Sequence, residues 1–327
     1  MAFSNTYDTT NNGSAVSNRE DLLDVLTILA PEETPVLSSS SKSKANATFV
    51  EWTVDSLSAP VTTGVAEGAD VTSFTDKFSN RARLGNYVQK FRRDYMVSDL
   101  QDAVESVGPA KVAQAEAKAV RELKRDIEAT LLSTNDRTVE DGAGVVYGLR
   151  GLGDWIDSAG PTDVPSDYRT PASSIHATGN FTETVLNNLI TSVYRVSGST
   201  NSMTLVADTA LRRVISDFAR TSESADYSIR NVNYPGGSGE IKLSVDMYSS
   251  DHGNVSIVNM NPDCAPDTTN KDTGYLINPD FIGVPELITL GSSRLPNLGG
   301  GERGYVDWTG TLCVKHPGAF AKITALS

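Results

Sequence analysis

Three histidines and two cysteines are the residues of this sequence best suited to bind zinc, and a cysteine can also act as a nucleophile. His176, His252 and His316 each lack a second histidine or cysteine at the spacing of a zinc site. Cys264 and Cys313 stand alone, and two cysteines are too few for a disulfide framework. The sequence therefore predicts no metal ligands and two reduced thiols.

A hydrolase triad could begin at Asp251 and His252, because an acid that orients a histidine is part of that arrangement. Adjacent residues point apart, however, and no G-x-S-x-G elbow presents a nucleophilic serine. The pairs Glu32–Glu33 and Glu140–Asp141 lie beside Pro or Gly in expected loops, where the burial that raises a carboxyl pKa is not expected. We expect no catalytic residue.

A glycine-rich passage at residues 142–155 has the look of a phosphate-binding loop at Gly148, Gly151 and Gly153. No apolar strand precedes these glycines, and no amphipathic helix begins at the last of them, as dinucleotide binding would require. Turns and close backbone packing explain the glycines better. We expect no cofactor and no cofactor-binding residue.

The composition narrows the function classes further. With 28 Lys and Arg against 41 Asp and Glu, the chain has a formal net charge of −13, which argues against a protein that grips nucleic acid by neutralising phosphates. Its 327 residues allow a sizeable buried core, and its 26 glycines favour a fold rich in strands and loops. No apolar run approaches the roughly 20 residues of a membrane helix, so we expect no membrane partner.

The first segment, residues 1–45, is polar apart from one short amphipathic helix that starts near Asn18 and ends at Pro31. A short apolar helix on a polar arm cannot bury itself, so it needs a surface on its own chain or on a neighbour. Leu22, Leu26 and Leu29 on this helix are therefore candidates for a subunit interface.

Residues 46–98 read as two long strands, 48–54 and 83–92, joined by a wide loop. Five acids and no base lie between residues 51 and 76, and six bases and no acid lie between residues 77 and 93. The two arms of the hairpin could neutralise each other, or the hairpin could dock by charge on another subunit; the sequence leaves both open. The interface candidates here are Trp52, Glu67, Asp70, Arg81, Arg83, Lys90, Arg92 and Arg93.

Residues 109–133 give the strongest helix pattern, with Pro109 suited to the first turn. We expect one apolar face, with two small residues beside it, formed by Val112, Val120, Leu123, Ile127, Leu131, Ala113 and Ala117. The pairs Lys118–Glu122 and Lys124–Glu128 are expected on the exposed side. Such a helix can cross a whole domain.

Residues 181–274 alternate between helix and strand. The pattern predicts helices at 182–194 and 209–220 and strands at 203–208, 241–248 and 253–259. A polar loop at 222–239 contains Tyr234, the last interface candidate. Residues 275–290 and 304–325 are strand-like, and no internal repeat is present.

This order of parts resembles the major capsid proteins of tailed double-stranded DNA bacteriophages, with the Hong Kong 97 phage-type capsid fold. The resemblance spans nearly the whole chain, and its most specific blocks are residues 19–35 and 81–87. The other motifs that carry it are Glu51-Trp52, Glu67-Gly-Ala-Asp70, residues 122–128 and residues 148–152.

The resemblance implies an α+β fold with an N-terminal arm (1–45), an extended β-hairpin loop (46–98), a long spine helix with a peripheral sheet (99–180), an axial domain (181–274) and return strands to the peripheral domain (275–327). It also implies a structural role, in which copies of the chain form pentamers and hexamers of an icosahedral shell around packaged double-stranded DNA.

The partners implied by the resemblance are other copies of the chain, a scaffolding protein, a portal, a decoration or cement protein, and DNA in weak non-specific contact. The implied location is the virion, after synthesis in the cytoplasm of a bacterial host. A β-rich decoration or tail-binding module is the alternative from another class, although the long charged helix and the lack of repeats argue against it. A hydrolase with an unrecognised site is a third.

Overall fold

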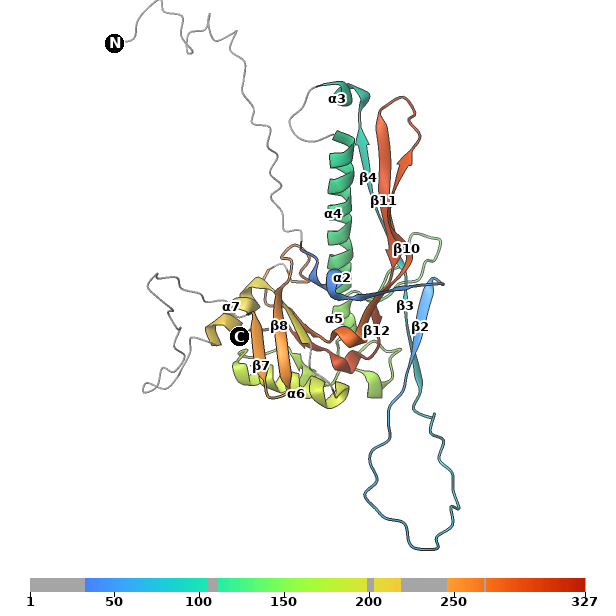
Figure 1. The fold of residues 1–327 in the computed structure, drawn as a ribbon, viewed down its shortest axis with the longest axis vertical. Helices are drawn as coiled ribbons and strands as arrows, with labels where there is room; N and C mark the ends of the chain where they lie inside the picture. The colour runs from blue at the N-terminus through green and yellow to red at the C-terminus, as the bar shows by residue number, and fades with distance from the viewer. Residues whose placement is uncertain (1–32, 105–110, 199–202, 219–245, 268, 327) are drawn as a thin grey trace, which may run out of the picture.

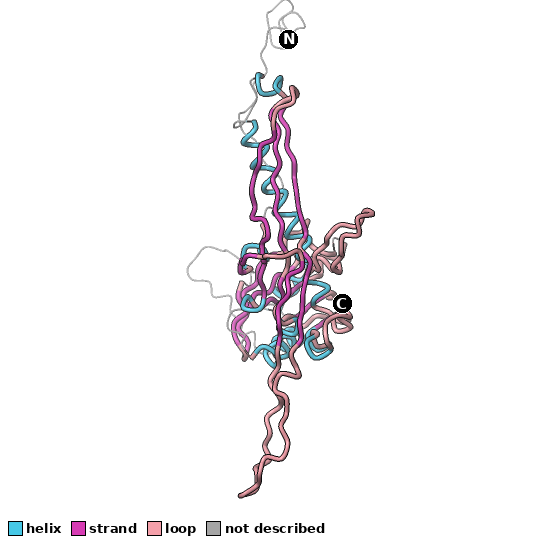
Figure 2. The backbone as a smooth tube through the Cα atoms, turned by 90° about the vertical axis from the view of Figure 1, so that its right-hand side faces the viewer, coloured by secondary structure: helices cyan, strands magenta, loops and turns pink. Residues whose placement is uncertain are grey.

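The computed structural model describes residues 33–104, 111–198, 203–218, 246–267 and 269–326. The molecule is elongated: one long helix and one long sheet run side by side, and a second sheet with its helices lies at one end of them (Figures 1 and 2). This mixture of helices and strands is the fold class that the sequence predicted.

The long sheet has the strand order β1-β10-β11-β4, with β12 paired to β10. All its pairings are antiparallel except that of β1 with β10, which is parallel. Its strands are β1 (Ser41–Lys44), β4 (Gln89–Val97), β10 (Ile282–Leu295), β11 (Glu302–Gly310) and β12 (Cys313–Val314).

Helix α4 (Lys111–Leu132) is the predicted spine helix, and it packs along β4 and β11. Four of its buried apolar residues recur at every fourth position, at Ala119, Leu123, Ile127 and Leu131, as one face of a helix requires, and the adjacent Leu132 is buried as well. Pro109 lies outside the described residues. At 1.5 Å per residue the helix is about 33 Å long, so it supports the sheet over much of its length.

Two expectations for this helix were wrong. Ala113 and Ala117 are exposed, because the buried face runs through Ala119 instead. Glu128 is fully buried and does not face solvent beside Lys124, because it binds a segment that lies 91 and 92 residues earlier in the chain.

The second sheet has the strand order β5-β13-β9-β6-β8-β7. Helices α6 (Glu183–Ser197) and α7 (Thr209–Phe218) share its apolar cluster, as the sequence predicted. The side chain of Thr182 caps α6 by accepting a hydrogen bond from the N–H of Val185. The strands are β5 (Ile175–His176), β6 (Met203–Ala207), β7 (Met247–Ser250), β8 (Gly253–Asn259), β9 (Gly274–Ile277) and β13 (Ala321–Ile323).

This sheet crosses the expected domain boundaries. Strand β5 precedes residue 181, and β9 and β13 come mostly after residue 274, yet all three pair in one sheet with β6, β7 and β8 from residues 181–274. The apolar cluster of this region accordingly includes Leu276, Ala321 and Ile323 from the end of the chain. The end of the described chain therefore returns to the sheet that contains β6 and β8.

The predicted hairpin is shorter than expected, because its returning strand divides at Val88. Strand β2 (Phe49–Val54) pairs with β3 (Ala82–Tyr87), and the chain then leaves this pair to form β4 in the long sheet. Val88 is buried at the junction. Lys90, Arg92 and Arg93 consequently lie on the long sheet and not on the hairpin. The expectation that six bases lie along the returning arm of the hairpin was therefore wrong for these three.

The described chain also contains three short α-helices, α2 (Pro35–Ser39), α3 (Asp99–Ala103) and α5 (Leu152–Trp155), and four 3-10 helices of three residues each. Helix α2 packs against the spine helix, and α3 lies at the far tip of the long sheet (Figure 1). Within the described ranges, no helix combines the length and apolar character needed to cross a membrane.

Candidate functional site

The root of the β2–β3 hairpin is fixed to the body of the subunit by a buried amide. Asn86 is 0% exposed, and its Nδ2 donates to the carbonyl oxygens of Arg150 at 3.2 Å and Leu312 at 2.9 Å. Its Oδ1 accepts from the N–H of Arg150 at 2.8 Å. Both ends of the amide are therefore satisfied, which removes the usual penalty for burying it.

Arg150 continues this anchor with its own side chain. The guanidinium is almost fully buried and forms ion pairs with Asp136 at 2.6 Å, Asp163 at 2.8 Å and Asp154 at 3.0 Å. It also lies over the ring of Trp155, with 4.8 Å between its central carbon and the ring centroid. The five donors of a guanidinium allow such divided pairing, which a lysine could not reproduce.

The pKa shifts follow from this arrangement. Burial alone would raise the pKa of Asp163, but the hydrogen bond and charge of Arg150 outweigh it and lower that pKa. Burial raises the pKa of Asp154 despite the opposing charge of Arg150. The network therefore stabilises the subunit most at pH values where Asp163 is ionised.

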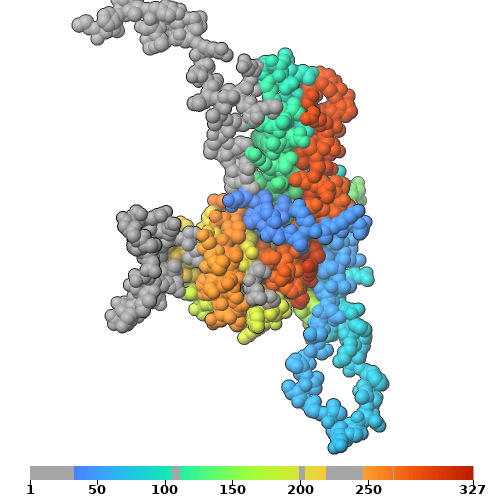
Figure 3. Space-filling model, in the orientation of Figure 1, coloured from blue at the N-terminus to red at the C-terminus, as the bar shows by residue number. Residues whose placement is uncertain are grey.

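Beyond the root, residues 55–81 form a long loop that projects from the body (Figures 1 and 3). Side chains that a folded chain would normally bury lie open along it: Leu57 (99% exposed), Val61, Val65, Val71, Phe74 (90% exposed) and Phe78. Single exposed apolar residues are ordinary, but six within one loop indicate a contact surface.

Two ion pairs join the two arms of the hairpin at the neck of this loop, the part formed by residues 51–55 and 80–83. Arg81 pairs with Asp55 at 2.8 Å and Arg83 with Glu51 at 3.7 Å, so two of the predicted bases are neutralised within the hairpin. The hydroxyl of Tyr168 donates to the carbonyl of Asn80 and holds the neck against the body. Further out, Glu67 and Asp70 are exposed, and the described part of the chain offers neither of them an ion pair.

The opposite end of the molecule carries a second apolar surface. It is formed by α3 and its flanks together with the β10–β11 turn, and its exposed side chains are Met96, Leu100, Val104, Leu295 and Leu298. The β2–β3 loop and α3 project from opposite ends of the described molecule (Figure 1), so apolar side chains are exposed at both ends.

A recess of about 550 Å³ lies on the long sheet, and Lys90 and Arg92 are among the residues that line it. Arg93 on the same strand pairs with Asp126 of the spine helix, so Lys90 and Arg92, at alternate positions, belong to the sheet face away from that helix. Val146 and Ile288 add exposed apolar surface to the recess. The recess thus combines apolar groups, two bases and one acid, Glu140, in one concave surface.

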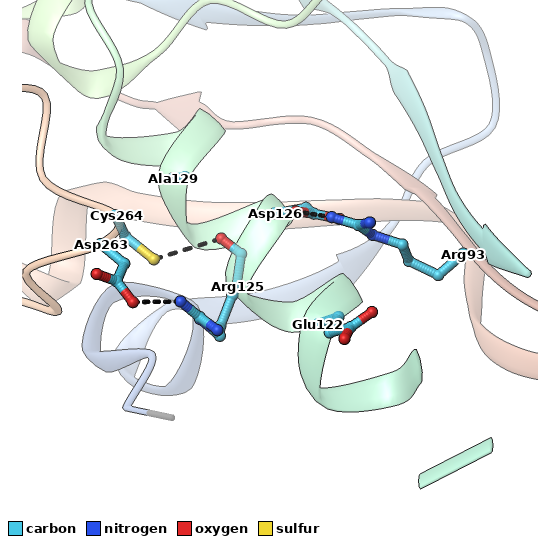
Figure 4. A pocket seen from close by; sticks show the side chains of 7 residues that line it. All are labelled: Arg93, Glu122, Arg125, Asp126, Ala129, Asp263 and Cys264. Atoms are coloured by element: carbon cyan, nitrogen blue, oxygen red, sulfur yellow. Dashed lines mark hydrogen bonds and ion pairs between the residues drawn. The ribbon is translucent and has the colours of Figure 1, made fainter. Parts of the chain in front are cut away.

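A smaller recess of about 310 Å³ lies between the spine helix and the loop that follows β8 (Figure 4). Its charges are already paired: Arg93 binds both carboxylate oxygens of Asp126, at 2.6 and 2.8 Å, and Arg125 pairs with Asp263. Burial raises the pKa of Cys264 in this recess to about 11, so the thiol stays protonated and unreactive. No group of three metal-ligating side chains occurs among the described residues.

Three of the predicted interface residues, Trp52, Lys90 and Arg93, contact other residues of the same subunit. Trp52 is half-buried, and its ring lies 5.7 Å from that of Trp155 in the same subunit. Lys90 pairs with Asp307 at 3.5 Å, and Arg93 pairs with Asp126, as described above. Leu22, Leu26, Leu29 and Tyr234 lie outside the described residues.

The structure also contains features that the sequence analysis missed. In the sequence, Arg150 lies within a glycine-rich passage and Asn86 within an expected strand, and neither position has a pattern that marks it as buried. The sequence does contain a signal for the exposed loop. Residues 57–78 include six large apolar residues that follow neither the period of a strand nor that of a helix, which is consistent with a surface that another chain covers.

Comparisons with known proteins found one family model and a set of solved structures that match this chain. A family model described as "SU10 major capsid protein" matches residues 3–327. A comparison with curated proteins found no match.

Among solved structures, the capsid of the cyanophage P-SCSP1u matches with a TM-score of 0.64 and 11% identity, over 99% of this chain and 98% of that chain. The capsid of a native GTA particle matches with a TM-score of 0.62 and 12% identity, over 98% and 99% of the two chains. The SrpI encapsulin from Synechococcus elongatus PCC 7942 matches with a TM-score of 0.55 and 11% identity, over 95% and 93%. At these identities the shared property is the fold.

Proposed function

Because the chain belongs to the SU10 major capsid protein family, it is a structural protein of a capsid shell, and we propose that its exposed hairpin loop is the element that joins neighbouring subunits in that shell. The family match covers nearly the whole chain, so it supports a shell protein over the alternative, in which the chain as a whole is a β-rich decoration or tail-binding module. The observation that carries the proposal is the set of six exposed apolar residues between Leu57 and Phe78.

Burial of this loop against a neighbour would stabilise the assembled state. Each large apolar side chain that becomes buried contributes about 1.5–3 kcal/mol, against which the cost of ordering the loop must be set. A closed shell repeats the same contact at every subunit, so a modest net gain per contact is sufficient.

The recess on the long sheet of a neighbouring subunit suits this loop as a docking surface. Glu67, Asp70 and Asp76 give the loop acidic groups, and the recess offers Arg92 beside apolar Val146 and Ile288, with one acid, Glu140, in its lining. In the described residues no ion pair within the subunit involves Arg92, in contrast to Lys90 and Arg93. Charge complementarity would set the register of the loop, and apolar contact would supply the affinity.

The remaining contacts of the shell are also part of the proposal. Leu22, Leu26 and Leu29 would dock the N-terminal arm on a neighbour, and the loop at 222–239 with Tyr234 would lie at the centres of pentamers and hexamers. Support comes from the sequence patterns, since these residues lie outside the described ranges.

We further propose the partners that such a shell requires: a scaffolding protein during assembly, a portal, and a decoration or cement protein on the finished particle. Synthesis would take place in the cytoplasm of a bacterial host. The net charge of −13 supports weak, non-specific contact with packaged DNA, because like charges let DNA slide past a surface.

The loop proposal is tested by the double variant Leu57→Asp with Phe74→Asp, compared with Thr62→Asp with Ser73→Asp. Both variants add two charges to the same loop, but only the first removes apolar surface. We expect the first to remain as unassembled subunits or capsomers in sedimentation and electron microscopy, and the second to form shells. Normal shells from the first variant would contradict the proposal.

A further inference from the structure

A buried carboxyl group connects the spine helix to the start of the described N-terminal segment. Glu128 on α4 is 0% exposed. Its Oε1 accepts from the N–H of Val36 at 2.9 Å, and its Oε2 accepts from the N–H of Leu37 at 2.8 Å. These N–H groups belong to the first turn of α2, where no backbone carbonyl of the helix can reach them.

The segment that Glu128 holds is residues 33–45. Before α2, the side chain of Asn261 donates to the carbonyl of Glu33 at 3.1 Å. After α2, strand β1 runs parallel to β10 along the edge of the long sheet, and the N–H of Ala45 donates to the backbone carbonyl of Glu286 at 2.9 Å. Glu128 therefore binds this segment near the point where the first 32 residues join it.

No charged group near Glu128 forms an ion pair with it among the described residues. Helix α2 carries no titratable side chain. On the elements packed nearby, Arg125 of α4 is paired with Asp263, and Arg93 of β4 is paired with Asp126. The remaining titratable groups there are Lys124 and Glu33, both exposed, and Cys264, whose pKa is raised by burial and by the charge of Glu128. Within the described residues no ion pair involves Glu128.

Two opposing effects therefore act on this carboxyl group. Burial penalises its ionised form, and the two N–H groups favour that form. Burial is the larger effect, and it raises the pKa of Glu128 to about 7 from its ordinary value of 4.5. A docked segment thus favours a protonated Glu128, whereas an open segment would let solvent reach the ionised carboxylate.

From this geometry we propose that Glu128 is a proton-controlled latch for residues 33–45: the segment stays docked on the spine helix when the carboxyl group is protonated and opens more readily when it is ionised. The contact lies within one subunit, so the inference does not depend on how subunits assemble. It identifies a point at which the N-terminal arm can be held or freed without a change in the rest of the fold.

The sign and range of the effect follow from proton linkage. A group whose pKa is higher in the docked state than in the open state stabilises the docked state at low pH and loses this contribution as the pH rises. With pKa values of about 4.5 when solvated and about 7 when docked, opening should increase about tenfold per pH unit between these values and level off above the higher one.

Hydrogen exchange on the full-length chain tests the latch. Protection of the Val36 and Leu37 amides, normalised to their intrinsic exchange rates at each pH, should fall about tenfold per unit between about pH 5 and about pH 7. The amides of β6, buried in the axial region, serve as the internal reference and should show no such slope. A flat profile at Val36 and Leu37, or protection that rises with pH, would overturn the proposal.

Three variants separate the latch from a purely structural contact. Glu128→Gln removes the titration and should give protection that does not change with pH. Asn261→Ala loosens the same segment by another bond, so it should lower protection by a constant factor and retain the native slope. Glu122→Gln, on the same helix but partly exposed, should leave the native profile unchanged. A native slope in Glu128→Gln would show that another group is responsible.

Discussion

The β2–β3 hairpin is held in opposite ways at its two ends. At the root, Leu84 and Asn86 are buried, and Asn86 and Arg150 use nearly all of their hydrogen-bonding groups within the subunit. At the other end, Leu57 and Phe74 are 99% and 90% exposed. One continuous element therefore contains both the completed interactions of a folded domain and an apolar surface without a partner in the subunit.

This difference separates the free energy of folding of one subunit from the free energy of assembly. Contacts at the root contribute to the stability of the single subunit, because they are complete within one chain. The loop can contribute only when a neighbour covers it. Substitutions at the root should consequently change unfolding, whereas substitutions in the loop should change assembly alone.

The largest effect is expected when the buried cation at the root is removed. Arg150→Leu would remove the charged hydrogen bonds to Asp136 and Asp163 and the contact with the Trp155 ring. Hydrogen bonds to charged groups contribute about 1.5–3 kcal/mol each, and the lower end applies here because the carboxylates are partly exposed and Asp163 keeps its pair with Arg137. Urea unfolding of dissociated subunits should show this loss. Arg294→Ala, which breaks only the exposed pair with Glu302, should change the free energy of unfolding by less than about 1 kcal/mol. Equal effects of the two substitutions would contradict the role of the root.

A smaller effect is expected for Asn86→Ala. The substitution leaves the N–H of Arg150 and the carbonyl of Leu312 buried without their partner, at a cost of about 1–3 kcal/mol. The same urea measurement should detect it, and the exposed Asn254→Ala on β8 provides the control. Assembly should also decline, because the loop would no longer be held at a fixed angle. A native-like unfolding midpoint for Asn86→Ala would show that the amide does not anchor the hairpin.

The smallest effect is expected at the neck of the loop. Arg81→Ala removes an exposed ion pair with Asp55 and the stacking of Arg81 on Phe78, which lie 4.1 Å apart from guanidinium carbon to ring centroid. Such exposed pairs contribute about 0–1 kcal/mol, so the unfolding midpoint of the subunit should hardly move. A loss as large as that of Arg150→Leu would mean that the neck, and not Arg150, anchors the hairpin.

The elements whose residues repeat with a clear period were predictable from the sequence. Leu123, Ile127 and Leu131 on α4 and Leu186, Leu189, Ile190 and Val193 on α6 are buried as their spacing indicated. Local periodicity records which face of an element is apolar, and burial of that face is what the fold requires.

Features that depend on a distant partner could not be predicted in this way. The division of the returning strand at Val88 depends on β11, which lies more than 200 residues later in the chain. Glu128 has the spacing of an exposed partner for Lys124, and only the docking of Val36 and Leu37 makes it a buried acceptor. In the same way, Arg93 belongs to a basic run in the sequence but to Asp126 in the structure.

Limited proteolysis of the loop in free subunits and in assembled shells tests the central claim most directly. If neighbours bury the loop, a protease should cut within residues 55–81 rapidly in free subunits and much more slowly in shells, while cleavage of the buried root stays slow in both. Equal cleavage of the loop in the two states would contradict the account, because the exposed apolar surface would then remain uncovered in the shell.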